Sequence, residues 1–320
     1  MREAYKRRIG YRGELEEISH AVCSGFNLGG FTSNDLILIG YQDFNFSLET
    51  AKGKYFVKVF GTSKNDEYCQ RLVDVVTEAV KAKVKTPKLY ESEQGFLHKL
   101  ELPGCNLRLC VMEYIEGQDI FSMGDTLKPE EVRTIAQQAA LINSLDIKPQ
   151  SFYDAWVVVN FLKEFRKTKN HLSAKDLALI EPLAQEFEDL RIDELPHCFV
   201  HGDITLTNVM RDNDNGLWIV DFCDASYNVR IQELAILDCG LFFNPESKAE
   251  SEEYLNLALE EYQKKIGLTD RELQALPTYI TLSHAMYVME TTYALTRNNT
   301  PKENEYWYQR ARAGLEQMLG

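Results

Sequence analysis

The chain has 320 residues, a formal net charge of −14 and 44% hydrophobic residues. This length accommodates one large domain or two lobes, and the composition is that of a folded globular protein. The negative charge argues against nucleic acid, which needs a basic surface, and against an anionic membrane surface.

Seven cysteines are scattered along the chain without a CxxC pair, at positions 23, 69, 105, 110, 198, 223 and 239. This pattern predicts reduced thiols in the cytoplasm and disfavours a disulfide framework or a zinc site. The N-terminus lacks the apolar core of a signal peptide, and no apolar run reaches the ~18 residues of a membrane span. The sequence therefore predicts a cytoplasmic protein and leaves its oligomeric state open.

The first part of the chain has the pattern of short strands, expected at residues 36–40, 44–48 and 55–60. Lys58 lies in the third of these strands between two valines, with a phenylalanine on either side along its own face. A lysine with apolar neighbours on both faces must reach water or bind an anion. Lys58 is therefore a candidate phosphate ligand, and an edge-strand lysine that reaches water is the alternative.

A helix is expected at residues 65–83, followed by Pro87 and by strands near 89–91, 95–100 and 107–113. Helical periodicity dominates from Thr126 onward. It predicts helices at 129–145 and roughly 175–190 and a helical final part from about 250 to 320. Strands thus precede helices along the chain, which indicates an α+β fold.

The most informative stretch reads HGDITLTNVMRDNDNGLWIVD, at residues 201–221. Asn208 follows Asp203 in a short loop, and a hydrophobic strand then leads to Asp221. Phosphoryl transfer requires one carboxylate to orient the acceptor hydroxyl, and an Asp plus an Asn to hold Mg²⁺ on the nucleotide phosphates. We expect Asp203 to be the catalytic residue, with Asn208 and Asp221 as metal ligands. A solvated turn before a core strand is the alternative.

This stretch resembles the catalytic loop and metal site of the aminoglycoside phosphotransferase and choline kinase superfamily, small-molecule kinases with a protein-kinase-like fold. Gly202 stands where protein kinases have Arg, and Cys223 follows Asp221-Phe222 where they have Gly. Both departures favour a small-molecule substrate. The resemblance, over roughly residues 20–315, implies an N-terminal antiparallel-sheet lobe (1–113) and a larger, mainly helical C-terminal lobe (114–320).

The resemblance also implies ATP and Mg²⁺ as cofactors and assigns nucleotide-binding roles in the first lobe. Lys58 would contact the α- and β-phosphates and pair with a carboxylate of the next helix. Glu78 is favoured for that pairing over Asp74, although spacing alone does not separate them. Asn45 lies in a segment that looks like the nucleotide-covering hairpin, which also contains Gly40. Glu113 and Tyr114 lie in the segment that resembles the adenine-binding hinge.

In the second lobe the resemblance implies that His201 stabilises the catalytic loop and that Glu233 braces it through backbone hydrogen bonds. A Leu-His pair is usual near the end of the helix at 129–145, whereas this chain has Ile142-Asn143. No chemical cost of that departure is evident from the sequence.

The acceptor is the least determined part of the prediction. The segment that begins at Asp224 resembles the corresponding segment of hydroxylysine kinases. The hairpin that contains Gly40 and Asn45 resembles that of homoserine kinases. His284 and Tyr287 follow helical spacing and could line an acceptor pocket, although core packing explains that spacing equally well. We expect a hydroxy amino acid or amino alcohol of hydroxylysine, homoserine or choline/ethanolamine type.

An aminoglycoside or a methylthioribose-like sugar is the alternative acceptor. A non-catalytic, pseudokinase-like nucleotide-binding module is the alternative of another class. That class is disfavoured because the lysine, the catalytic Asp and both metal ligands are present.

Overall fold

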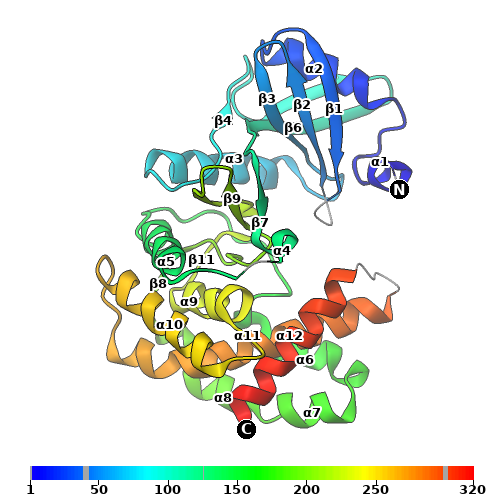
Figure 1. Cartoon of the computed structure of the whole chain (residues 1–320). Coiled ribbons are helices and arrows are strands. Elements are labelled where there is room, and N and C mark those ends of the chain that lie inside the picture. The colour runs from blue at the N-terminus through cyan, green and yellow to red at the C-terminus, as the bar shows by residue number, and fades with distance from the viewer. Residues whose placement is uncertain (1, 39–42, 125, 298–301) are drawn as a thin grey trace. The chain divides into compact units, whose positions relative to one another are not determined.

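The computed structural model describes residues 2–38, 43–124, 126–297 and 302–320, and the chain divides into two compact units. The first unit comprises residues 1–117 and 212–214, and the second comprises 118–211 and 215–320. The boundary predicted after residue 113 lies at the end of a strand, and the observed division follows shortly after it, at Gly117. Figure 1 labels many of the helices and strands of both units.

The first unit is built on a six-stranded antiparallel sheet with the order β1-β2-β3-β6-β4, in which β5 also pairs with β6. The strands are β1 (Phe31–Ile37), β2 (Phe44–Thr50), β3 (Gly53–Val59), β4 (Leu89–Tyr90), β5 (His98–Leu102) and β6 (Cys105–Glu113). The helices are α1 (Arg2–Ile9), α2 (Leu15–Gly25) and α3 (Asp66–Lys81). The first strand therefore begins earlier than the sequence pattern predicted.

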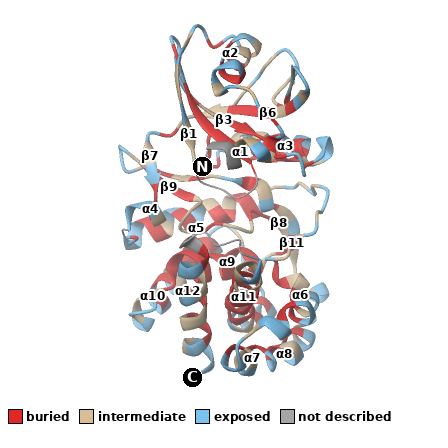
Figure 2. Ribbon diagram, turned by 90° about the vertical axis from the view of Figure 1, so that its right-hand side faces the viewer, coloured by how far each residue is buried: buried red, intermediate tan, exposed pale blue. Residues whose placement is uncertain are grey.

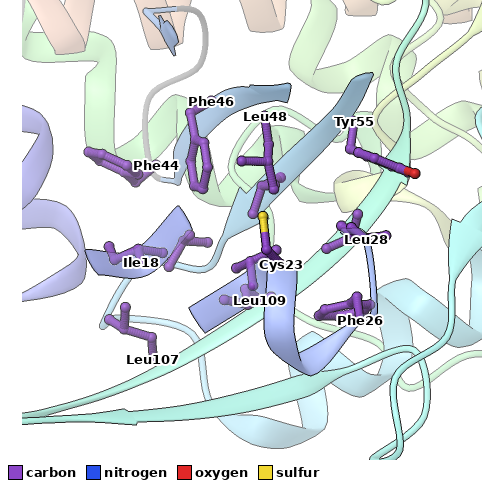
Figure 3. Packing of buried hydrophobic residues seen from close by; sticks show 14 of the residues in the cluster. Ile18, Cys23, Phe26, Leu28, Phe44, Phe46, Leu48, Tyr55, Leu107 and Leu109 are labelled. Atoms are coloured by element: carbon purple, nitrogen blue, oxygen red, sulfur yellow. The ribbon is translucent and has the colours of Figure 1, made fainter. Parts of the chain in front are cut away.

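One face of this sheet forms a hydrophobic core with α1 and α2 (Figure 3). Phe44, Phe46 and Leu48 of β2 are almost completely buried in it. Because successive side chains of a strand point to opposite faces, the residues between them face the other way. Asn45 and Lys58 are directly opposite each other in the β2–β3 pairing, so the alternation places both on the second face.

The second unit contains two small sheets and most of the helices. Its strands are β7 (Gly117–Asp119), β8 (His197–Val200), β9 (Val209–Asp212), β10 (Leu217–Ile219) and β11 (Ser226–Val229), paired as β10-β9-β7 and β11-β8. Its α-helices are α4 (Ile120–Met123), α5 (Pro129–Asn143), α6 (Phe161–Thr168), α7 (Ala174–Ile180), α8 (Leu183–Leu190), α9 (Ile231–Leu237), α10 (Lys248–Gln263), α11 (Asp270–Thr296) and α12 (Lys302–Leu319). The short helical segments are η1 (Val158–Asn160), η2 (Lys169–His171), η3 (Ile192–Glu194), η4 (Phe222–Asp224) and the π-helix η5 (Asp238–Phe242).

Local sequence signals explain several helix boundaries. Pro129 opens α5, where its missing N–H has no intrahelical partner to lose. At the start of α11, Thr269 and Glu272 form a capping box. The single helix predicted at 175–190 is wrong: the chain forms α7 and α8 there, and Pro182 separates them because it interrupts the hydrogen-bond ladder.

Helix α11 is the central helix of the second unit, and Figure 2 shows it as largely buried. All its residues from Tyr279 to Thr291 are buried. A helix surrounded by protein on all sides cannot be oriented from periodicity alone, because apolar residues occur on every face. None of the described helices is both long and apolar enough to cross a membrane.

Asp238, at the start of η5, is a buried acid whose titration should be visible in the stability of the protein. Burial raises its pKa to about 7, against the opposing charge of Arg310. Below about pH 4, Asp238 is protonated in both the folded and the unfolded state, so its burial carries no cost from ionisation. Stability is lost as the pH rises from about 4 to 7, because only the unfolded state ionises freely there.

We expect Asp238→Asn to flatten this part of the pH–stability profile. Relative to wild type, its free energy of unfolding should rise by about 2–4 kcal/mol between pH 4 and 7, as measured by urea denaturation. Asp214→Asn, at an exposed acid, controls for the change in net charge. Parallel profiles for Asp238→Asn and wild type would contradict the prediction.

Candidate active site

The loop at residues 201–208, called the Asp203 loop below, is held at its start by the buried carboxylate of Glu233. Strand β8 leads directly into His201. One oxygen of Glu233 accepts a hydrogen bond from the backbone N–H of His201 at 2.6 Å, and the other accepts from Gly202 N–H at 3.2 Å. Gly202 has a φ of 78°, a conformation that glycine adopts without steric cost. The first turn of the loop is thus fixed by one side chain of α9.

Asn143, at the end of α5, completes this network and was missed by the sequence prediction. Its amide donates to Glu233 at 2.8 Å and to the carbonyl of Phe199 at 3.0 Å. Its own oxygen accepts from the hydroxyl of Tyr262 at 2.7 Å. Burial raises the pKa of Glu233 to about 7, against the hydrogen bonds from His201, Asn143 and Gly202. Asn143, which stands where the family usually has His, therefore supplies a hydrogen-bond donor to the buried Glu233.

His201 connects the Asp203 loop to the segment that carries Asp221. Its Nδ1 accepts from the backbone N–H of Asp203 at 3.2 Å, so the proton of the neutral ring resides on Nε2. Nε2 lies 3.2 Å from the carbonyl oxygen of Val220 and donates to it. Burial lowers the pKa of His201 to about 4. The imidazole is therefore neutral and structural in this arrangement, and both ring nitrogens are engaged.

Asp203 and Asn208 are joined within the loop. The amide nitrogen of Asn208 donates to the carboxylate of Asp203 at 2.6 Å and to its backbone oxygen at 2.9 Å. These two bonds use the amide hydrogens and leave Oδ1 of Asn208 as the atom suited to a cation. The backbone N–H of Val220 donates to the carbonyl of Asn208 at 3.0 Å, which brings Asp221 close to the loop.

Asp221 follows β10 in a left-handed backbone conformation, with φ 65° and ψ 75°. A non-glycine residue pays for this conformation in strain, which persists mainly where function requires it. Asp221 and Asn208 supply oxygen donors, the type that hard divalent cations prefer. No group of three or more His, Cys, Asp or Glu side chains could hold a metal in the ranges that the structure describes. Mg²⁺ fits such a pair, since it commonly takes one or two protein ligands with phosphate oxygens and water.

Three carboxylates lie close enough to Asp203 for their charges to act on it. Burial raises the pKa of Asp203 well above its ordinary value, and the negative charges of Asp224, Asp221 and Asp154 raise it further. The structure thus brings the predicted Asp224 into the site and adds Asp154, from the segment between α5 and η1. This concentration of negative charge favours a cation among these side chains.

Aromatic side chains of the second unit adjoin these acids. Tyr287 of α11 is near enough to Asp203, Asp154 and Asp224 for their charges, after burial, to raise its pKa well above the ordinary value. The ring of Trp156 packs edge-on against Tyr287 with centroids 5.3 Å apart, and the ring of Trp307 lies 5.7 Å from it. Tyr287 was predicted for this site, whereas the two tryptophans were not.

His284 does not belong to this aromatic group, so its prediction as an acceptor ligand is wrong. It is fully buried, and its Nδ1 lies 3.2 Å from the sulfur of Cys239. Its ring packs edge-on against Phe243, and a Cβ on Gly314 would clash with it. Helical spacing misled here because α11 is buried on all sides, so residues one turn apart can face different partners.

In the first unit, Lys58 pairs with Asp43 rather than with a carboxylate of α3. Its Nζ lies 3.6 Å from Asp43, and Lys64 approaches the same carboxylate at 2.7 Å. The other oxygen of Asp43 accepts from the backbone N–H of Gly61 at 3.0 Å. Asn45 is the cross-strand neighbour of Lys58. Gly40, which was expected in the same hairpin, lies outside the described residues.

The predicted pairing of Lys58 with Glu78 is therefore wrong in this structure. Glu78 is partly exposed and forms an ion pair with Lys81 at 2.7 Å. Asp74, the alternative, is exposed and accepts from Gln70 at 2.8 Å. The buried side of α3 consists instead mainly of apolar residues such as Leu72 and Val76.

Glu113 ends β6 and Tyr114 directly follows it, and their role as an adenine-binding hinge stays a prediction. The backbone N–H of Glu113 donates to the carbonyl of Lys88 at 2.9 Å. That N–H is consequently used within the first unit. The ammonium of Lys54 lies 4.1 Å from the ring centroid of Tyr114, in cation–π geometry.

A comparison with models of known protein families identifies the family of this chain. The model described as "Phosphotransferase enzyme family" matches residues 36–268, well over half of the chain. The protein belongs to this phosphotransferase family. No curated protein sequence matches it.

Solved structures of other phosphotransferases share the fold. An amicoumacin kinase in complex with AMP-PNP and Ca²⁺ has a TM-score of 0.70 at 17% identity, with 99% of this chain and 96% of that chain covered. A microcompartment-associated aminopropanol kinase has a TM-score of 0.71 at 11% identity, covering 94% and 95%. A choline kinase from Streptococcus pneumoniae has a TM-score of 0.59 at 18% identity, covering 95% and 100%. The predicted α+β, protein-kinase-like fold is therefore confirmed.

As a member of this family, the protein is a phosphotransferase. Sequence reasoning missed four residues around the candidate site, namely Asn143, Asp154, Trp156 and Trp307. A polar residue on the buried side of α5 was the available signal for Asn143. For Asp154 and Trp156 it was an acid flanked by aromatic residues in a stretch without periodicity.

Proposed function

We propose that the protein transfers the γ-phosphate of ATP, with Mg²⁺, to a hydroxyl of a small cationic metabolite, an amino alcohol or a hydroxy amino acid. The observation that carries this proposal is the Asp203–Asn208 hydrogen bond of 2.6 Å beside Asp221. It joins a carboxylate able to orient a hydroxyl to two oxygen donors suited to a metal. That is the set that phosphoryl transfer requires.

Asp203 would align the acceptor hydroxyl and accept its proton as the new bond to phosphorus forms. Asn208 Oδ1 and the carboxylate of Asp221 would hold Mg²⁺, which when bound neutralises charge on the β- and γ-phosphates. Asp203 must be ionised to accept a proton. Burial and neighbouring acids raise its pKa, and nearby positive charge from the metal or the acceptor would lower it again.

Glu233 and His201 would act on Asp203 only through the backbone. Glu233 holds the N–H groups of His201 and Gly202. His201 in turn accepts from the N–H of Asp203. These contacts fix the direction of the loop without touching a reacting atom.

In the first unit, Lys58 would contact the α- and β-phosphates of ATP, with Asn45 as its cross-strand neighbour. Glu113 and Tyr114 would lie along the adenine. Because the N–H of Glu113 donates to Lys88, we propose that other backbone groups of this segment meet the adenine edge.

We expect Asp43→Asn to raise the KM for ATP several-fold and to lower stability by about 1–3 kcal/mol. The cause is the loss of a charge that orients two buried lysines. Urea denaturation and initial rates at varied ATP measure the two effects. Glu78→Gln is the matched control, since its exposed pair with Lys81 is worth at most about 1 kcal/mol. A larger rise in the KM for ATP with Glu78→Gln than with Asp43→Asn would contradict the Lys58–Asp43 pairing and support the predicted pairing of Lys58 with Glu78.

The preference for a cationic acceptor rests on the four acids and on the aromatic rings of Trp156 and Tyr287 beside them. Ammonium groups are attracted both to carboxylates and to aromatic faces. The structural neighbours named for aminopropanol and choline support this class. An aminoglycoside, also polycationic, is the second candidate, since other neighbours are named for amicoumacin and spectinomycin. A neutral sugar lacks the charge that this site favours.

Two assays test the proposal. ATP with MgCl₂ should raise the thermal unfolding midpoint by several degrees more than ATP with EDTA. ADP release should then be highest with one of ethanolamine, choline, homoserine or hydroxylysine, compared with an aminoglycoside and methylthioribose. No shift with ATP under either condition would contradict the nucleotide assignment. Highest turnover with the neutral sugar would contradict the acceptor class.

All seven cysteines are free thiols. This supports a reducing compartment, and we propose the cytoplasm.

A further inference from the structure

The Asp203 loop meets the π-helix η5 at a point where only glycine fits. A Cβ built on Gly240 would lie 2.6 Å from Cγ2 and 3.2 Å from Cβ of Thr205. Thr205 is itself buried, so its methyl group has little room to withdraw. The backbone N–H of Leu206 donates to the carbonyl of Gly240 at 3.1 Å. The loop and η5 are therefore in direct backbone contact at this point.

This contact lies inside the turn that presents Asn208 to Asp203. The backbone N–H of Asn208 donates to the carbonyl of Thr205 at 3.0 Å. The hydroxyl of Thr205 also lies 3.1 Å from that of Thr207. The carbonyl of Leu206 accepts from the N–H of Phe121 at 3.0 Å. A displacement of Thr205 would consequently move the residue whose amide bonds to Asp203.

The opposite side of η5 is fixed, so η5 cannot yield easily to an added methyl group. The carbonyl of Cys239 accepts from Nε of Arg310 at 3.3 Å, and its sulfur contacts Nδ1 of His284 at 3.2 Å. Arg310 and His284 are both buried. Packed interiors transmit such strain rather than absorb it. The loop is then the side that moves.

We propose that Gly240 is a positioning residue: the absence of its side chain seats Thr205 against η5 and so sets the alignment of Asp203 with Asn208. Glu233 holds the start of the Asp203 loop, and Gly240, on the helical segment that directly follows α9, holds its middle. π-Helical turns are often found at functional sites. The inference rests on the proposed function insofar as Asp203 and Asn208 carry the reaction.

The test compares Gly240→Ala with the double variant Thr205→Ser/Gly240→Ala. The serine removes the methyl group that the new Cβ would meet and keeps the hydroxyl that contacts Thr207. We expect Gly240→Ala to lower kcat about 10- to 100-fold, measured as ADP release with the acceptor of highest turnover among those named above. It should also reduce the part of the ATP thermal shift that depends on MgCl₂. The double variant should recover both quantities to within about threefold of Thr205→Ser alone.

Gly267→Ala is the matched control, because a Cβ there meets nothing within 4 Å. It should leave kcat and the thermal shift unchanged. A Gly240→Ala variant within twofold of wild type would overturn the proposal, as would a folded Gly240→Ala variant that Thr205→Ser does not rescue. If Gly240→Ala is insoluble, a soluble and active double variant supports the proposal and an insoluble one overturns it. Failure of the proposed function would show separately, as wild-type protein without an ATP shift or turnover.

Discussion

Replacing Asp203 by asparagine is expected to lower kcat by about 10²- to 10⁴-fold while the protein stays folded. Asparagine keeps the size of the side chain but cannot accept a proton from the acceptor hydroxyl. Its carbonyl oxygen can still accept from the amide of Asn208, which now donates to the carboxylate at 2.6 Å, so the loop should keep this hydrogen bond. The KM for ATP should change little. Initial rates of ADP release measure kcat and KM, and circular dichroism shows whether the variant is folded.

The control for Asp203→Asn is Asp214→Asn, which makes the same chemical change at an exposed acid of the turn after β9. It should retain wild-type turnover. A folded Asp203→Asn variant with wild-type kcat would contradict the role given to this residue.

Glu233→Gln is expected to destabilise the second unit and to reduce turnover together. The side chain is fully buried and accepts hydrogen bonds from His201, Gly202 and Asn143. An amide nitrogen in place of one oxygen leaves at least one of these donors unsatisfied, at a cost of about 1–3 kcal/mol for each. The loop would also lose its anchor, so kcat should fall about tenfold or more. Urea denaturation and ADP release measure these changes.

Glu253→Gln supplies the comparison for Glu233→Gln, since Glu253 is an exposed acid on α10. Its free energy of unfolding should stay within about 0.5 kcal/mol of wild type. A Glu233→Gln variant with wild-type stability and turnover would show that the Asp203 loop does not depend on this brace.

The elements and residues that depend on local pattern were predictable from the sequence. Strands β2, β3 and β6 follow alternation, and the spacing of Asp203, Asn208 and Asp221 places them in one loop–strand unit. The hydrogen bonds between Asp203 and Asn208 span only five residues. Short-range geometry of this kind is specified by the residues in between.

Partners from distant segments were not predictable. Lys58 pairs with Asp43, which directly precedes β2, the neighbour of β3, whereas the family resemblance suggested a carboxylate of α3, with Glu78 favoured. Helical spacing predicted Tyr287 and His284 for the same acceptor pocket. The charges of Asp203, Asp154 and Asp224 raise the pKa of Tyr287, whereas His284 contacts Cys239. Asn143 and Asp154 come from segments far from residue 203, and no local rule places them there.

The central claim is transfer of phosphate from ATP to a cationic small-molecule hydroxyl at Asp203. The most direct measurement follows ³²P from [γ-³²P]ATP with MgCl₂ onto ethanolamine, choline, homoserine, hydroxylysine and an aminoglycoside, for wild type and Asp203→Asn. The account predicts labelled phosphate on one of these acceptors with wild type and a loss of that label with Asp203→Asn. Label found only in inorganic phosphate, or equal transfer by both proteins, would contradict it.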